Sequence, residues 1–132
     1  KQHLSTLIEF VKSAEIVSEG KTAVVIGGGL GRSKETQKVV REFLSQISVP
    51  CVNDADAIYA ISSNLEILKG KKCLLTPHSY EFYILTGEKI KDLKDVDKIK
   101  KVKEKASALQ VTILLKGKID IISDGEKVGV NK

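Results

Sequence analysis

The 132-residue sequence contains no methionine and no tryptophan. A translation product begins with methionine unless it has been processed, and this chain begins with Lys1, so we expect a trimmed part of a longer protein. Modified methionines left out of the sequence would leave the same trace. No apolar run approaches the roughly 20 residues that a membrane helix needs, so we expect no membrane partner. The apolar segments are regularly spaced, which excludes disorder as the main state.

Arginine and aromatic residues are also scarce. Arg32 and Arg41 are the only arginines, and the aromatic residues are three Phe and three Tyr. Proteins that recognise nucleic acids depend on arginine forks and stacking aromatic rings. We therefore expect no nucleic-acid partner, and we interpret the net charge of +5 as a solvated lysine surface. An anionic small molecule would suit this charge equally well.

The sequence has two cysteines, Cys51 and Cys73, each in a short apolar segment. Two cysteines at this separation are too few for a structural metal site and do not form a disulfide framework. Their apolar neighbours favour buried, reduced thiols. Since reduced thiols are typical of intracellular proteins, we expect a cytoplasmic protein.

Short runs of β-branched residues along the chain predict buried strands, and apolar residues three and four apart predict amphipathic helices. Ser33 is expected to cap one of these helices, and Asp124-Gly125 is expected to form a hairpin turn. The expected strands are residues 22–26, 50–53, 72–76, 111–115, 119–123 and 126–130, and the expected helices are residues 4–17, 33–47, 54–61, 77–87 and 96–109.

This alternation predicts right-handed βαβ crossovers. We therefore expect an α/β fold of three layers, a mostly parallel sheet with helices on both faces, formed by residues 1–132 as part of a single domain. Ligands of such sheets bind at the carboxyl ends of the strands. Four polar segments follow predicted strands and should converge on one site: GGGLG at 27–31, NDADA at 53–57, TPHSYEF at 76–82 and KGKID at 116–120.

The glycine-rich segment leads directly into a helix. Gly27, Gly28 and Gly29 allow close backbone approach, and free N–H groups at a helix start favour an anion. The alternative is a loose turn without a ligand, because one glycine suffices for a turn. The dinucleotide-binding fingerprint is excluded, because it requires glycine where Arg32 stands.

Paired carboxylates follow the next strand. We expect Asp56 to be the N-cap of a helix and Asp54 to face the site, toward a magnesium-bound phosphate. His78 and Glu81 are three residues apart and share a helix face. We expect no metal site there, because further ligands are not evident. Substrate hydrogen bonding and a satisfied histidine at a helix start both stay open.

The last segment places Lys116-Gly117 after a buried strand. A lysine can neutralise a phosphate as a point charge, and a glycine lets backbone N–H groups approach it. A lysine that ends a strand without any function is the alternative. The position beside the other three segments favours the phosphate interpretation.

Taken in order, GGGLGR, DADAI, TPHSYEF with LTG at 85–87, and LLKGKIDII resemble the ADP/ATP-dependent NAD(P)H-hydrate dehydratase family of the ribokinase-like superfamily. The family motifs read GPGLGR, DADAL, TPHPGEF with LTG, and a strand end that contains KG. Gly28 replaces the proline of the first motif, and Ser79-Tyr80 replaces Pro-Gly in the third. A family GGSGD segment, which carries the catalytic aspartate, has no counterpart before Lys132. The resemblance therefore implies an incomplete ribokinase-like domain.

The resemblance implies a repair activity that converts the hydrated cofactors NADHX and NADPHX back to NADH and NADPH. ATP or ADP, with Mg²⁺, would phosphorylate the ring hydroxyl, and phosphate would then be eliminated. The residues expected on the substrate side are Gly27, Gly29, Asp54, His78 and Glu81, and those on the nucleotide side are Lys116, Gly117, Lys118, Ile119 and Asp120.

Two other functions compete with this one. A kinase of the same superfamily, acting on a sugar or another small molecule, would share the fold and the phosphate site. A non-catalytic nucleotide-binding module would fit the missing GGSGD segment. TPHSYEF favours the dehydratase, because His78 and Glu81 match its pattern. Exposed strand edges in a partial domain also suggest a homo-oligomer.

Overall fold

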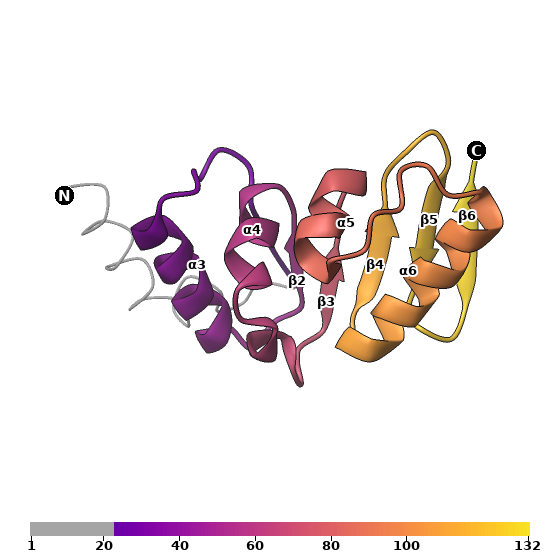
Figure 1. The fold of residues 1–132 in the computed structure, drawn as a ribbon. Helices are drawn as coiled ribbons and strands as arrows, with labels where there is room; N and C mark the ends of the chain where they lie inside the picture. The colour runs from indigo at the N-terminus through magenta and orange to yellow at the C-terminus, as the bar shows by residue number, and fades with distance from the viewer. Residues whose placement is uncertain (1–22) are drawn as a thin grey trace.

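The computed structural model describes residues 23–132, which form an α/β unit around a six-stranded sheet (Figure 1). The strands lie side by side in chain order, from β1 to β6. Pairings from β1 to β4 are parallel, whereas β5 and β6 add to the sheet as an antiparallel hairpin. The predicted mostly parallel sheet is therefore confirmed. The helix expected over residues 4–17 lies outside the described residues.

The elements fall close to their predicted positions, apart from a short 3₁₀ helix, η1 (Leu65–Leu68), that the sequence did not predict. A single 3₁₀ turn is too short to show a helical periodicity. The strands are β1 (Val24–Ile26), β2 (Cys51–Asn53), β3 (Cys73–Leu75), β4 (Thr112–Leu115), β5 (Asp120–Ser123) and β6 (Val128–Asn131). The α-helices are α3 (Lys34–Gln46), α4 (Asp56–Ser62), α5 (Ser79–Thr86) and α6 (Asp95–Leu109).

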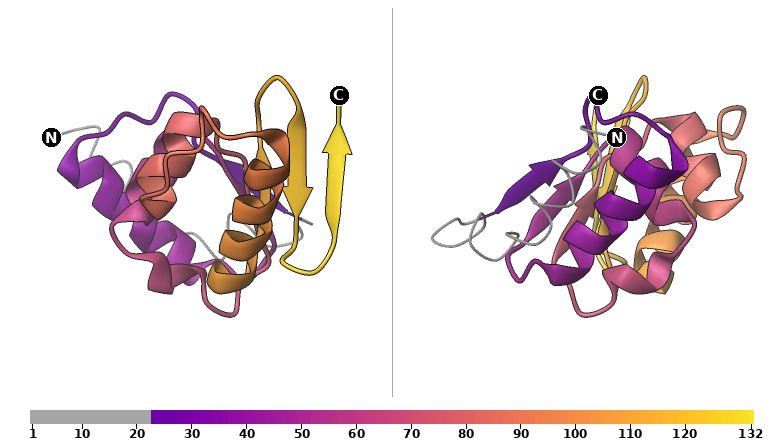
Figure 2. Two further views of the ribbon diagram at one scale, coloured as in Figure 1. Left: turned by 45° about the vertical axis from the view of Figure 1, so that its right-hand side comes forward. Right: turned by 90° about the vertical axis from the view of Figure 1, so that its left-hand side faces the viewer.

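All four described α-helices lie on one face of the sheet (Figure 2). The expectation of helices on both faces is thus met on one face only within residues 23–132. Strand order explains this arrangement. Crossovers of the same hand place their helices on the same side as long as successive strands advance in one direction, and β1 to β4 advance without a reversal. On the opposite face, Val25 is 75% exposed.

The core lies between this helical layer and the sheet. Ser33 caps α3 as predicted, because its hydroxyl accepts the N–H of Thr36 at 3.1 Å. Gly87 ends α5 in the left-handed conformation, also as predicted. Side chains that are at most 2% exposed include Phe43, Leu44, Ile58, Ile61, Leu68, Leu75, Phe82, Ile90, Val102, Ile113 and Ile121.

The apolar spacing that predicts a helix over residues 96–109 also predicts that Val96, Val102 and Ala106 face the core, and at Val96 this is wrong. Val96 is exposed in the first turn of α6, whereas Val102 and Ala106 are buried. At about 100° per residue, six residues place Val96 roughly 120° around the helix from Val102.

Among the described residues, no helix is long and apolar enough to cross a membrane.

Candidate functional site

The four polar segments meet along one edge of the sheet, as the sequence predicted. Strands β1 to β4 run parallel, so their carboxyl ends share that edge. Three backbone hydrogen bonds join neighbouring ends: Asp54 N to Ile26 O at 3.0 Å, Thr76 N to Asn53 O at 3.2 Å, and Lys116 N to Pro77 O at 2.9 Å. The functional side chains of this edge therefore stand on a continuous backbone ladder.

Gly27 begins the glycine-rich loop after β1 and touches the end of β2. Its φ is +150°, and a Cβ built on it would lie 1.7 Å from the carbonyl oxygen of Asp54. No other residue fits there without moving the backbone. Gly29 also has a positive φ, but a Cβ at Gly28 or Gly29 would meet nothing within 4 Å. The loop is thus packed at Gly27 and open at the next two residues.

Asp56 holds the far end of this loop. Its carboxylate accepts the N–H of Gly31 at 2.8 Å and the Nε–H of Arg32 at 2.9 Å. These donors, Gly31 foremost, keep the pKa of Asp56 below its ordinary value. The Arg32 guanidinium in turn lies 3.8 Å from the centre of the Tyr59 ring. The prediction that Asp56 is an N-cap is wrong: Ala55 holds that position, and the Asp56 carboxylate is engaged by the loop.

Asp54 connects the ends of three strands. One carboxylate oxygen accepts a hydrogen bond from Thr76 Oγ1 at 2.9 Å and another from Lys116 Nζ at 3.0 Å. Burial alone would raise the pKa of Asp54, but these hydrogen bonds and the charge of Lys116 outweigh it and lower that pKa. The side chains of Asp54 and Lys116 are 40% and 42% exposed. Lys116 is therefore within reach of an incoming anion, although it is paired here.

This pairing joins residues that the sequence assigned to different sides of the site. Asp54 was expected beside the substrate and Lys116 beside the nucleotide. Thr76 was missed altogether as a partner of Asp54, although its place between a strand and His78 could have drawn attention to it. The two expected sides thus meet at one charged contact.

His78 is the N-cap of α5 and forms a reciprocal capping box with Glu81. His78 Nδ1 accepts the Glu81 N–H at 3.3 Å, and the Glu81 carboxylate accepts the His78 N–H at 3.1 Å. The imidazole Nδ1 is therefore occupied, in agreement with the satisfied-histidine alternative. The His78 side chain is 53% exposed, however, and that of Glu81 is 5% exposed. Glu81 is placed to orient His78, while the exposed part of the ring can still meet a ligand.

The residues 116–119 form the turn between β4 and β5. Within it, the Gly117 N–H donates to the Asp120 carboxylate at 3.2 Å. The sequence predicts that this N–H approaches a phosphate, and it could do so only if Asp120 released it. Lys118 is exposed, and Ile119 packs partly against the core.

Residues 23–132 contain no group of three or more His, Cys, Asp or Glu side chains that could hold a metal ion. Mg²⁺ usually keeps several waters and binds through one or two carboxylates together with substrate phosphates. Asp54, as a half-exposed carboxylate, fits that mode of binding with a nucleotide.

Comparisons with known proteins agree with this arrangement. The sequence pattern of the NAD(P)H-hydrate dehydratase family matches residues 4–132. The chain is 33% identical over 129 residues to a bifunctional NAD(P)H-hydrate repair enzyme of Hyperthermus butylicus, covering 94% of this chain and 24% of that protein. It is 39% identical over 113 residues to an ATP-dependent (S)-NAD(P)H-hydrate dehydratase of Dictyostelium discoideum, covering 81% of this chain and 37% of that protein.

A solved structure extends the likeness to three dimensions. The ADP/ATP-dependent NAD(P)H-hydrate dehydratase of Bacillus subtilis, co-crystallised with ATP and Mg²⁺ and soaked with CoA, superposes with a TM-score of 0.69 at 29% identity. The match covers 83% of this chain and 39% of that one. The chain thus spans well under half the length of these relatives. With the family pattern matched along nearly its whole length, the chain belongs to the NAD(P)H-hydrate dehydratase family.

Proposed function

We propose that this chain is the part of a nucleotide-dependent NAD(P)H-hydrate dehydratase that binds both the adenine nucleotide and the hydrated nicotinamide cofactor. The complete protein would restore NADHX and NADPHX to NADH and NADPH with ATP or ADP. The observation that carries the proposal is the Asp54–Lys116 contact at 3.0 Å, at the edge where four family motifs meet. Family membership supports the reaction class.

In this proposal Lys116 neutralises a nucleotide phosphate. Its ammonium is half-exposed and held by a single described carboxylate, so a more highly charged phosphate can replace that partner. Asp54 is then released toward the cation that accompanies the nucleotide, and Mg²⁺, when bound, would supply charge neutralisation on the phosphates. Gly117, Lys118, Ile119 and Asp120 line the nucleotide side, as the resemblance implies.

The substrate side comprises the open part of the glycine loop and the ring of His78. Gly29 has room beside it for a ligand to approach the backbone, and Gly27 keeps the loop against Asp54. Glu81 fixes the orientation of His78 through the capping box. We assign no catalytic base to residues 23–132.

The first experiment measures ADP binding to the full-length protein by calorimetry. Lys116→Ala should weaken binding at least about tenfold, because a hydrogen bond to a charged group contributes about 1.5–3 kcal/mol. Lys127→Ala is the matched control, since it removes an exposed lysine from the turn between β5 and β6. Equal affinities of the two variants would refute the nucleotide role of Lys116.

The second experiment separates substrate chemistry from helix capping at His78. Asparagine is a good N-cap, so His78→Asn should keep the cap of α5 while removing the imidazole, and His78→Ala should lose the cap hydrogen bond as well as the imidazole. We expect both variants to bind ADP normally and to lose NADHX turnover, measured as recovery of the reduced-nicotinamide absorbance. Normal turnover by His78→Asn would exclude a substrate role for the ring.

The same absorbance assay on the unmodified protein, with and without ATP or ADP, tests the reaction itself. Nucleotide-dependent recovery is the expected result. Nucleotide binding without any recovery would favour the kinase or the non-catalytic module over the dehydratase.

A further inference from the structure

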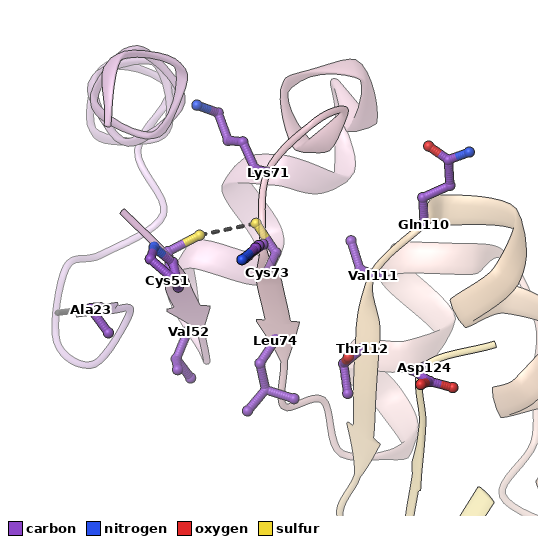
Figure 3. Close-up of a pocket in the computed structure, with 12 residues that line it drawn as sticks. Ala23, Cys51, Val52, Lys71, Cys73, Leu74, Gln110, Val111, Thr112 and Asp124 are labelled. Atoms are coloured by element: carbon purple, nitrogen blue, oxygen red, sulfur yellow. Dashed lines mark hydrogen bonds between the residues drawn. The ribbon is translucent and has the colours of Figure 1, made fainter. Parts of the chain in front are cut away.

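The two cysteines face each other where β2 and β3 begin (Figure 3). The candidate site lies at the other end of these two strands. Cys51 and Cys73 are the first residues of β2 and β3 and are register partners in the parallel pairing. Their sulfur atoms lie 3.0 Å apart, and neither forms a disulfide. The prediction of buried, free thiols is thus confirmed, but residues far apart in sequence have become direct neighbours.

The backbone positions suit a covalent bond between these thiols. Neighbouring strands lie about 4.8 Å apart, which falls within the range of about 4.4–6.8 Å for the Cα atoms of a disulfide. Register partners also project their side chains to the same face of a sheet. A disulfide can therefore form between the two sulfur atoms while β2 and β3 stay paired.

The surroundings make Cys51 the more reactive thiol. When Cys73 is the donor of the hydrogen bond between the two sulfur atoms, that bond, with smaller contributions from Asn53 and Lys71, overcomes the effect of burial and lowers the pKa of Cys51 to about 7. The same hydrogen bond and burial raise the pKa of Cys73. Since the thiolate is the nucleophilic form, we expect Cys51 to be the sulfur that attacks first, and the two single variants below test this order.

The limited access to the two thiols restricts which oxidants can reach them. Both cysteines line an open hollow of about 500 Å³, together with Lys71, Gln110 and Thr112 (Figure 3). Cys51 and Cys73 are only 2% and 6% exposed, however. A small oxidant such as hydrogen peroxide fits this access better than a bulky disulfide.

We propose that Cys51 and Cys73 are a redox modification site that forms a reversible intramolecular disulfide with hydrogen peroxide. The Cys51 thiolate attacks one peroxide oxygen, the O–O bond breaks, and hydroxide leaves and takes up a proton as water. Cys51 is now a sulfenic acid. The Cys73 sulfur attacks Cys51 Sγ, the S–O bond breaks, and the hydroxyl leaves with the Cys73 proton as a second water. Two thiols lose two electrons and one peroxide becomes two waters.

The proposed bond would join the two strands that carry the centre of the candidate site. Asp54 follows Cys51 by three residues, and Thr76 follows Cys73 by three residues. At about 3.3 Å per residue, each lies about 10 Å along the strand from its cysteine. The modification itself does not depend on the proposed function, because it concerns only the two thiols.

The test uses the full-length protein, treated with hydrogen peroxide under native conditions, alkylated, and digested with trypsin without reduction. The expected product joins peptide 42–69, which contains Cys51, to peptide 73–89, which contains Cys73. Dithiothreitol should restore both free peptides. The proposal is overturned if the linked peptide does not form, or if it forms only after denaturation.

Two single variants test the order of the steps. In Cys73→Ser, Cys51 should accumulate as a sulfenic acid that dimedone traps, because no second thiol can resolve it. In Cys51→Ser, Cys73 should stay reduced under the same treatment. Stronger dimedone labelling of Cys73 than of Cys51 would refute the assignment of Cys51 as the attacking thiol. All these experiments detect modified peptides by mass spectrometry and none of them measures enzyme activity. A failure of the disulfide proposal is therefore distinguishable from a failure of the dehydratase proposal.

Discussion

Replacing Gly27 by alanine tests whether the contact between the glycine loop and β2 is essential to the fold. A Cβ at this position would overlap the Asp54 carbonyl oxygen, and φ is +150°. Because Asp54 N also donates to Ile26 O at 3.0 Å, the two segments cannot move apart without the loss of this hydrogen bond. The perturbation therefore acts on backbone that the side chains of the site depend on.

The magnitude follows from two terms. A residue forced into this sparsely populated conformation costs about 1–3 kcal/mol, and the loss of one backbone hydrogen bond costs about 0.5–1.5 kcal/mol. We therefore expect Gly27→Ala to lower the free energy of unfolding by about 1.5–4.5 kcal/mol. This is a large share of the roughly 5–15 kcal/mol that holds an ordinary domain folded.

Urea unfolding followed by circular dichroism measures this loss, with Gly28→Ala as the matched control. Gly28 is the next residue of the same loop, and a Cβ there meets nothing within 4 Å. Its replacement should change the free energy of unfolding by no more than about 1 kcal/mol, in either direction. Equal midpoints and slopes for the two variants would show that the contact with Asp54 does not prevent a residue with a side chain from occupying position 27.

Three further predictions concern single contacts. Asp56→Asn should weaken the dependence of folding stability on pH at acid pH. The pKa of Asp56 in the folded protein lies below its ordinary value, so the ionised carboxylate stabilises the protein above about pH 4. This contribution is lost as the pH falls further, and the variant lacks it at every pH. Urea midpoints at pH 6 and pH 3 would measure the difference, and parallel profiles would contradict it. Ser33→Ala should cost about 1 kcal/mol through loss of the α3 cap, and Ser33→Asp should restore it, whereas no rescue would argue against capping. Phe82→Ala, at a fully buried position, should cost about 3–5 kcal/mol in the same unfolding assay, and a cost below 1 kcal/mol would mean that this part of the core is loosely packed.

Most elements of the fold could be predicted because their causes are local. Ser33 accepts a hydrogen bond from a residue three positions away, and Gly87 ends α5 through its own left-handed conformation. The apolar spacing within residues 33–47 predicts an amphipathic helix, and its apolar residues Val39, Val40, Phe43 and Leu44 are the ones that α3 buries. Alternation of strands and helices also predicted that the four polar segments meet at one edge, because parallel strands bring their carboxyl ends together.

The partners within the site could not be predicted in this way. Lys116 and Asp54 are 62 residues apart in sequence, and their contact exists because β2, β3 and β4 lie in one register. The same register brings Cys51 to Cys73, although each cysteine by itself indicated only burial. Asp56 had the residue type and position of an N-cap, but two donors from the glycine loop take its carboxylate.

The sequence by itself determined the element types, the family motifs and the edge of the sheet at which they gather, because near neighbours along the chain set those preferences. Only the tertiary structure decided which charges pair, which thiols touch and on which face the helices lie. Those outcomes depend on strand order and register, which arise from the packing of distant segments, and no short stretch of sequence contains them.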